Sequence, residues 1–162
     1  MDFLEQLKQE VQTHGEQEID FRSRRFQHGR DLARTYIDII KDEARLSARS
    51  GQYQNVGNQV IISGFCRLTD RDFDLPPVQM QKRQSFWTGK WSEEYTLTQG
   101  NDLFEAFQTS FAEFCAEEHI AVEQFQAKIR KKDGKIVYRP LPVTITVPDV
   151  LEGFGFPFEI TL

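Results

Sequence analysis

Apolar residues recur every three or four positions over residues 101–118, which predicts an amphipathic helix. Asn101 is a favourable N-cap, and the acidic residues of the first turn suit the positive end of the helix dipole. The predicted apolar face consists of Leu103, Phe104, Phe107, Phe111, Phe114 and Cys115. Four phenylalanines on one face must be buried, so we expect this helix to pack on a sheet or on another helix.

The first fifty residues have the same helical period. Residues 2–14 form one predicted helix that ends at Gly15, and residues 26–50 form a second that ends at Gly51. A single longer helix with a break fits this region equally well. We expect one domain over residues 1–162, within which residues 1–23 can form a semi-independent N-terminal helix.

Most of the remaining chain alternates with the period of β-strands. Asp133-Gly134 is a strong hairpin turn, and Pro140 and Pro142 place the strand that follows at a sheet edge. Residues 69–83 are expected to form a loop. The predicted strands are 58–68 (central), 85–98 (kinked at Gly89), 122–130, 136–147 and 154–162. Since strands and helices do not alternate regularly, we predict an α+β fold: a mainly antiparallel sheet of four or five strands, with two or three helices packed on one face.

Composition favours a soluble cytoplasmic protein. The 162-residue chain has a formal net charge of −5, which argues against a dedicated nucleic-acid binder. No apolar run approaches the roughly 20 residues that span a bilayer, so we expect no membrane association. Cys66 and Cys115 lie in apolar patterns and are expected to be buried free thiols in a reducing compartment.

Two groups of aromatic residues are candidate partner-binding sites. Trp87 and Trp91 lie on the strand predicted at 85–98, and tryptophan is enriched among interface hot spots. The C-terminal strand carries Phe154, Phe156 and Phe158 on one face. We favour docking of this strand on its own sheet, with donation to a neighbouring chain as the alternative.

A basic cluster spans Arg22–Arg34 and is the alternative site, for a polyanion or nucleic acid. Its candidate residues are Arg22, Arg24, Arg25 and Arg30. Acidic residues interleave the bases further along the predicted helix, as expected for a solvated surface with local ion pairs. Together with the net charge, this makes nucleic acid the less favoured partner.

Candidate chemistry is sparse. Asp70, Asp72 and Asp74 alternate as in the opening of a calcium-binding loop, but the glycine and the closing glutamate of that motif are missing. Cys115 and His119 are four residues apart, yet Cys115 belongs to the apolar face. Nucleotide-loop and serine-hydrolase motifs are also missing. We therefore assign no catalytic residue, metal or cofactor.

These observations lead to three hypotheses of function. The preferred one is a non-catalytic module that binds another protein or associates with itself. The second is polyanion binding through the basic cluster. The third is an enzyme with a dispersed polar site that includes Asp70, Asp72 and His119.

Overall fold

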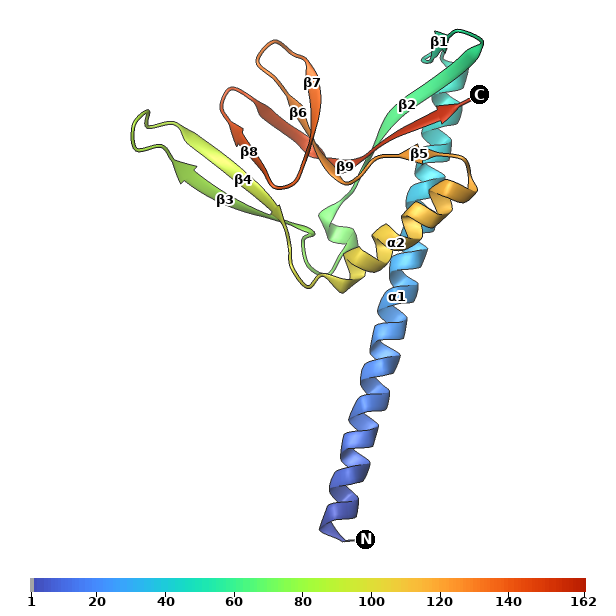
Figure 1. The fold of residues 1–162 in the computed structure, drawn as a ribbon, viewed down its shortest axis with the longest axis vertical. Coiled ribbons are helices and arrows are strands. Elements are labelled where there is room, and N and C mark those ends of the chain that lie inside the picture. The colour runs from blue at the N-terminus through green and yellow to red at the C-terminus, as the bar shows by residue number, and fades with distance from the viewer. Residues whose placement is uncertain (1) are drawn as a thin grey trace.

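A computed structural model describes residues 2–162 and has two α-helices and two antiparallel sheets (Figure 1). The helices are α1 (Phe3–Arg49) and α2 (Asp102–Glu117). A six-stranded sheet contains β1 (Gln54–Val56), β2 (Gln59–Arg67), β5 (Ala121–Val122), β6 (Gln126–Arg130), β7 (Ile136–Pro140) and β9 (Val150–Thr161). A three-stranded sheet contains β3 (Val78–Gln84), β4 (Trp91–Leu97) and β8 (Val143–Thr146), and a short 3-10 helix, η1, covers Asp70–Asp72.

The predicted combination of helices with antiparallel sheet is confirmed, but the predicted arrangement is wrong. The strands form two sheets, with the orders β1-β2-β9-β6-β7 and β3-β4-β8, and β5 pairs with β9. Residues 136–147 do not form one strand, because the chain leaves the large sheet after Pro140 and enters the small one at Val143. One segment with a continuous apolar pattern, residues 136–147, therefore contributes a strand to each of the two sheets.

Helix α1 passes through Gly15, so the predicted helix end at that residue is wrong. Asp2 begins α1 with a capping box, in which its side chain accepts a hydrogen bond from the Glu5 amide at 2.8 Å. Residues 3–24, called here the free segment, extend away from the body formed by residues 25–162 (Figure 1). All their side chains are exposed, so packing against the body does not stabilise this part of the helix.

The second part of α1 packs on α2. Gly29 permits the close approach: a Cβ there would lie 2.9 Å from the Cβ of Ala106 and 2.9 Å from the amide nitrogen of Phe107. The predicted face of α2 is confirmed as buried, and Asn101 caps the helix by accepting from the Phe104 amide at 3.1 Å. This face meets α1 and the large sheet in one core that includes Ala33, Tyr36, Ile40, Cys66, Phe156 and Phe158.

The C-terminal strand β9 lies inside its own sheet, between β2 and β6. This agrees with the expectation of docking on its own chain. Gly155 allows β2 to pair closely, since a Cβ there would lie 1.9 Å from the carbonyl oxygen of Cys66. Pro140 ends the edge strand β7, as its missing amide donor requires.

Residues 78–97 form a hairpin rather than a loop followed by one strand. The predicted strand at 85–98 is therefore wrong in its first half, and the expected loop at 69–83 contains η1 and β3. β3 pairs with β4 from Val78 opposite Leu97 to Gln84 opposite Trp91. Gly89 lies in the connecting turn with a φ of +68°, not in a kinked strand.

Candidate functional site

The β3–β4 hairpin carries both tryptophans of the chain. Its tip, residues 85–90, is closed by a hydrogen bond from the Ser85 amide to the Lys90 carbonyl and another from the Gly89 amide to the Ser85 carbonyl, both 2.9 Å. The tip presents Phe86 and Trp87, which are 91% and 90% exposed. Their rings meet edge to face at 5.4 Å. This geometry places two large aromatic side chains in water.

A groove of about 620 Å³ lies between the small sheet and the start of β9. This volume is in the usual range for small-ligand or side-chain sites. Trp91, Glu93 and Tyr95 share one face of β4 and form one wall, because alternate residues of a strand point to the same side. The full lining is Lys82, Trp91, Glu93, Tyr95, Ile145, Val147, Asp149, Val150 and Leu151.

The carboxylates of the groove are already engaged. The Tyr95 hydroxyl donates a hydrogen bond to Glu93, and burial, followed by this contact, raises the pKa of Tyr95 to about 12. The Lys131 ammonium lies 2.7 Å from Asp149. The groove is therefore mainly an apolar surface with a polar rim, a composition that suits binding.

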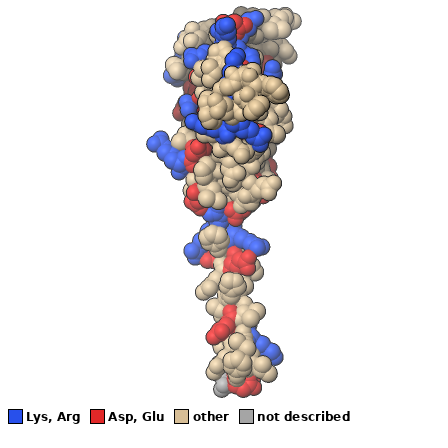
Figure 2. All heavy atoms as spheres, turned by 90° about the vertical axis from the view of Figure 1, so that its left-hand side faces the viewer, with Lys and Arg blue, Asp and Glu red and all other residues tan. Residues whose placement is uncertain are grey.

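Basic side chains flank the aromatic tip. Arg83 lies 3.7 Å from Glu94, whereas Lys82 and Lys90 have no carboxylate within 4.0 Å among residues 2–162. Figure 2 faces the side of the molecule on which the hairpin lies and shows a band of Lys and Arg side chains across it. The hairpin thus combines apolar and positive character in a chain of net negative charge.

The two predicted partner-binding groups have different positions. Trp87 and Trp91 are exposed on the hairpin, at 90% and 55%. Phe156 and Phe158 are buried in β9, and Phe154 is partly buried. The Phe156 ring packs on those of Phe107, Phe111 and Phe125. The three phenylalanines of β9 therefore belong to the core, and we do not carry them into the candidate site.

Each arginine proposed for polyanion binding has a carboxylate partner. Arg22 and Arg24 lie 2.7 Å from Glu18 and Asp20, one helical turn earlier. Arg30 lies 3.6 Å from Glu113, and its guanidinium stands 4.7 Å from the centre of the Phe114 ring. These contacts neutralise the cluster locally, so no observation favours the polyanion alternative.

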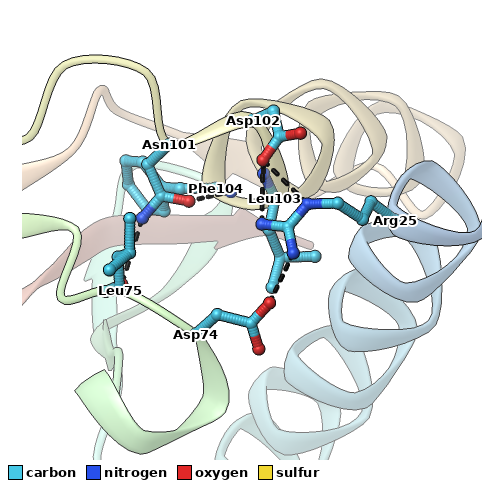
Figure 3. A network of polar contacts seen from close by, with 7 residues as sticks. All are labelled: Arg25, Asp74, Leu75, Asn101, Asp102, Leu103 and Phe104. Carbon is cyan, nitrogen blue, oxygen red and sulfur yellow. Dashed lines mark hydrogen bonds and ion pairs between the residues drawn. The ribbon is translucent and has the colours of Figure 1, made fainter. Parts of the chain in front are cut away.

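Arg25 is part of a structural network at the point where α1 leaves the body (Figure 3). Its guanidinium lies 2.8 Å from Asp102 and also contacts Asp74. Beside it, the Asn101 side chain donates to the Leu75 carbonyl at 3.1 Å. The hydrogen bonds to Asp102 and Asp74 raise the pKa of Arg25, and Arg25 in turn lowers the pKa of Asp102. This network joins α1, the segment after η1 and the start of α2.

Of the residues considered for metal or catalytic chemistry, Asp70 and Asp72 lie in η1, Asp74 follows η1, and Cys115 lies on α2. Asp72 accepts a hydrogen bond from the Tyr36 hydroxyl, and Asp74 is held by Arg25. Cys115 is 1% exposed, and burial raises its pKa to about 12, which keeps the thiol protonated. His119 follows the C-terminal end of α2, whereas the Asp74 contact is at its N-terminal end. No group of three or more His, Cys, Asp or Glu side chains within residues 2–162 is placed to hold a metal ion.

Some features of the site had no clear sequence signal. The polar stretch of β3, VQMQKRQ, lacks the alternation that would have predicted a strand, so the hairpin and its aromatic tip were missed. Of the groove residues on β8 and β9, Ile145 belongs to the strand predicted at 136–147, whereas Val150 and Leu151 lie outside the predicted strands. Gly89, between the two tryptophans, was the cue in the sequence to a turn at the tip.

Comparisons of this chain with protein-family models, with curated proteins and with solved structures find no match. Within the described residues, neither helix has the length and apolar character required to span a membrane.

Proposed function

We propose that this chain is a non-catalytic protein-binding module that contacts its partner through the β3–β4 hairpin. The observation that carries the proposal is the exposure of Phe86 and Trp87, 91% and 90%, at the tip of a turn closed by two backbone hydrogen bonds. Large aromatic side chains lose much unfavourable hydration when a partner covers them, and tryptophan dominates many interface hot spots.

The surroundings of the tip suggest the chemistry of the partner. The groove beside Trp91 offers an apolar surface for one or two side chains of the partner. Lys82 and Lys90, without carboxylate partners among residues 2–162, favour a negatively charged segment. We expect a peptide segment that places an aromatic or aliphatic residue next to Asp or Glu.

Catalysis has less support than binding. The Cys66 and Cys115 thiols are buried, and burial raises the pKa of both to about 12. Glu93 and Asp149 in the groove are engaged by Tyr95 and Lys131. These groups lack the free, activated nucleophile or base that a reaction requires.

Peptide selection tests the proposal. A phage-displayed library of random peptides is first depleted of peptides that bind the F86S/W87S variant. Peptides that bind the wild-type chain are then selected from it. The enriched peptides are then titrated while the emission of Trp91 and Trp87 is followed, since the hairpin holds both tryptophans of the chain. We expect acidic–apolar peptides, a blue shift of the emission on binding, and at least tenfold weaker binding to F86S/W87S, measured by calorimetry.

Y53S is the matched control, because Tyr53 is an exposed aromatic residue outside the hairpin. Its peptide affinity should equal that of the wild type. Peptides that bind F86S/W87S as tightly as the wild type, or a selection that enriches no peptide over the depleted pool, would contradict the proposal.

A further inference from the structure

The free segment of α1 carries an exposed apolar stripe, whose one contact with a body residue among residues 2–162 is the Arg25 guanidinium, 5.5 Å from the centre of the Phe21 ring. Leu4, Leu7, Val11 and Phe21 follow the alternating three- and four-residue spacing of a coiled-coil seam, with His14 and Glu18 at the intervening positions. The four apolar side chains are 65%, 40%, 73% and 58% exposed. In proteins, most helical stability comes from packing of an amphipathic face, and the free segment of α1 has such a face with no packing surface of the body against it.

The stripe leads into a hollow where α1 meets α2. The hollow has a volume of about 500 Å³ and is lined by Arg22, Arg25, Phe26, Asp102 and Ala106. Eighteen residues make about five helical turns, so Arg22 lies on the same side of α1 as Leu4, and Arg25 on the same side as Leu7. Stripe and hollow are therefore continuous along one face of the molecule.

We propose that a second copy of this chain covers this face, with the two free segments antiparallel. In the register that uses their whole length, Leu4 of one copy faces Phe21 of the other. Leu7 then faces Glu18, and Val11 faces His14, so every polar seam position has an apolar neighbour. A parallel pair would instead place the two copies of Glu18 against each other, which is unfavourable.

Charge and length favour the same arrangement. The first turn of α1 carries Asp2 and Glu5, whereas Arg22 and Arg24 lie at the other end of the free segment. Arg22 and Arg24 are paired with Glu18 and Asp20 within the helix, but these side chains are largely exposed, so antiparallel pairing lets Asp2 and Glu5 of the other copy extend the two ion pairs across the interface. It also places Phe3 and Leu4 of one copy beside the hollow of the other, where Phe26 is 49% exposed. The free segment ends where the hollow begins, so the overlap of the two helices is complete.

This inference concerns α1 and is independent of the hairpin proposed to bind other proteins. Sedimentation equilibrium of the full chain tests it. We expect a mass twice the 18.9 kDa of one chain at tens of micromolar, and at least tenfold weaker association of V11K. I19K is the matched control: Ile19 is 71% exposed, Val11 is 73% exposed, and Ile19 lies about 90° away from the stripe. Its dimer should persist.

Cysteine cross-linking tests the orientation. In the antiparallel register, position 10 of one copy lies beside position 17 of the other, so oxidised E10C/Q17C should form a covalent dimer while E10C alone should not. A monomeric chain at 100 µM would overturn the proposal, whether or not it binds vesicles or another protein. A dimer that survives V11K, or one in which E10C/Q17C fails to cross-link, would also overturn it.

Discussion

The Arg25 Nε atom donates a hydrogen bond to the Asp102 carboxylate at 2.8 Å, which fastens α1 to the first turn of α2. Arg25 also contacts Asp74, so one side chain joins three segments that are far apart in the sequence (Figure 3). Its side chain is 18% exposed, whereas those of the two carboxylates are mostly exposed. This relationship fixes the point at which the free segment begins.

We expect R25A to lower the free energy of unfolding by roughly 1 kcal/mol at pH 7, since exposure of the carboxylates screens these contacts. Arg25 lowers the pKa of Asp102, so the contribution of the pair is complete above the unfolded-state pKa of about 4 and is lost as the pH falls through the lowered native value. The difference between R25A and wild type, measured by urea denaturation, should therefore shrink at pH 2.5.

The control is R24A, whose only carboxylate contact within residues 2–162 is the exposed pair with Asp20. Its effect should stay within about 0.5 kcal/mol at both pH values. Equal effects of R24A and R25A would show that the network of Figure 3 does not hold α1 to the body.

The same substitution at two glycines of α1 should have opposite effects. A Cβ at Gly15 would meet no atom within 4 Å, so G15A should stabilise the free segment by about 1 kcal/mol through helix propensity. A Cβ at Gly29 would lie 2.9 Å from Ala106, so G29A should lower the free energy of unfolding by about 1–3 kcal/mol. Hydrogen exchange of residues 3–24 measures the first effect, and urea denaturation the second. Destabilisation by G15A would contradict the open environment of that residue.

Y36F should lower the free energy of unfolding by roughly 1.5–3 kcal/mol, because the Tyr36 hydroxyl donates to the Asp72 carboxylate and accepts from the Thr69 amide at 3.1 Å. Burial, followed by the Asp72 contact, raises the pKa of Tyr36 to about 12. The unfolded state ionises near pH 10, so this contribution falls as the pH rises from about 10 to about 12. The wild-type advantage over Y36F should shrink in that range. Y53F, at an exposed tyrosine, is the control with little expected change.

Both thiols should resist alkylation in the native protein. Cys66 and Cys115 are each 1% exposed, and burial raises the pKa of both to about 12. At pH 8 almost no thiolate is present, so iodoacetamide should modify neither residue on the timescale that labels a free peptide thiol. Mass spectrometry should find two additions per chain after denaturation in guanidinium. Rapid native labelling of Cys66 would contradict the burial of that face of β2, and rapid labelling of Cys115 would contradict the position of α2 in the core.

Local sequence patterns predicted an element correctly where a single periodicity or turn motif determines its structure. The face of α2 and the turn at Asp133-Gly134 are examples: Gly134 takes a φ of +84°, and β6 and β7 form the expected hairpin. Gly15 misled the prediction because a glycine in the middle of a helix costs only about 1 kcal/mol, which the long flanking helix tolerates.

Long-range arrangement was beyond these patterns. Nothing local distinguishes a strand in the large sheet from one in the small sheet, so the change of sheet between Pro140 and Val143 could not be predicted. Trp87 and Phe156 both occur in aromatic-rich segments. Trp87 is exposed because it lies in the turn between β3 and β4, whereas Phe156 is buried because β9 lies between β2 and β6. The sequence therefore predicted the two tryptophans of the candidate site, but it did not predict the groove beside them.

Because α1 is continuous, the direction in which its N-terminal stripe faces depends on the number of residues between the stripe and the body. One continuous helix runs from Phe3 to Arg49. Inserting one residue near position 24 would rotate the Leu4–Val11 stripe by about 100° relative to the body, while inserting seven would restore its phase and lengthen the free segment by about 10 Å. A second copy bound to the stripe, as proposed, would therefore lie at an angle and a distance from the aromatic hairpin that α1 determines. In the proposed dimer, the residue count of α1 would therefore set the orientation of the two bodies.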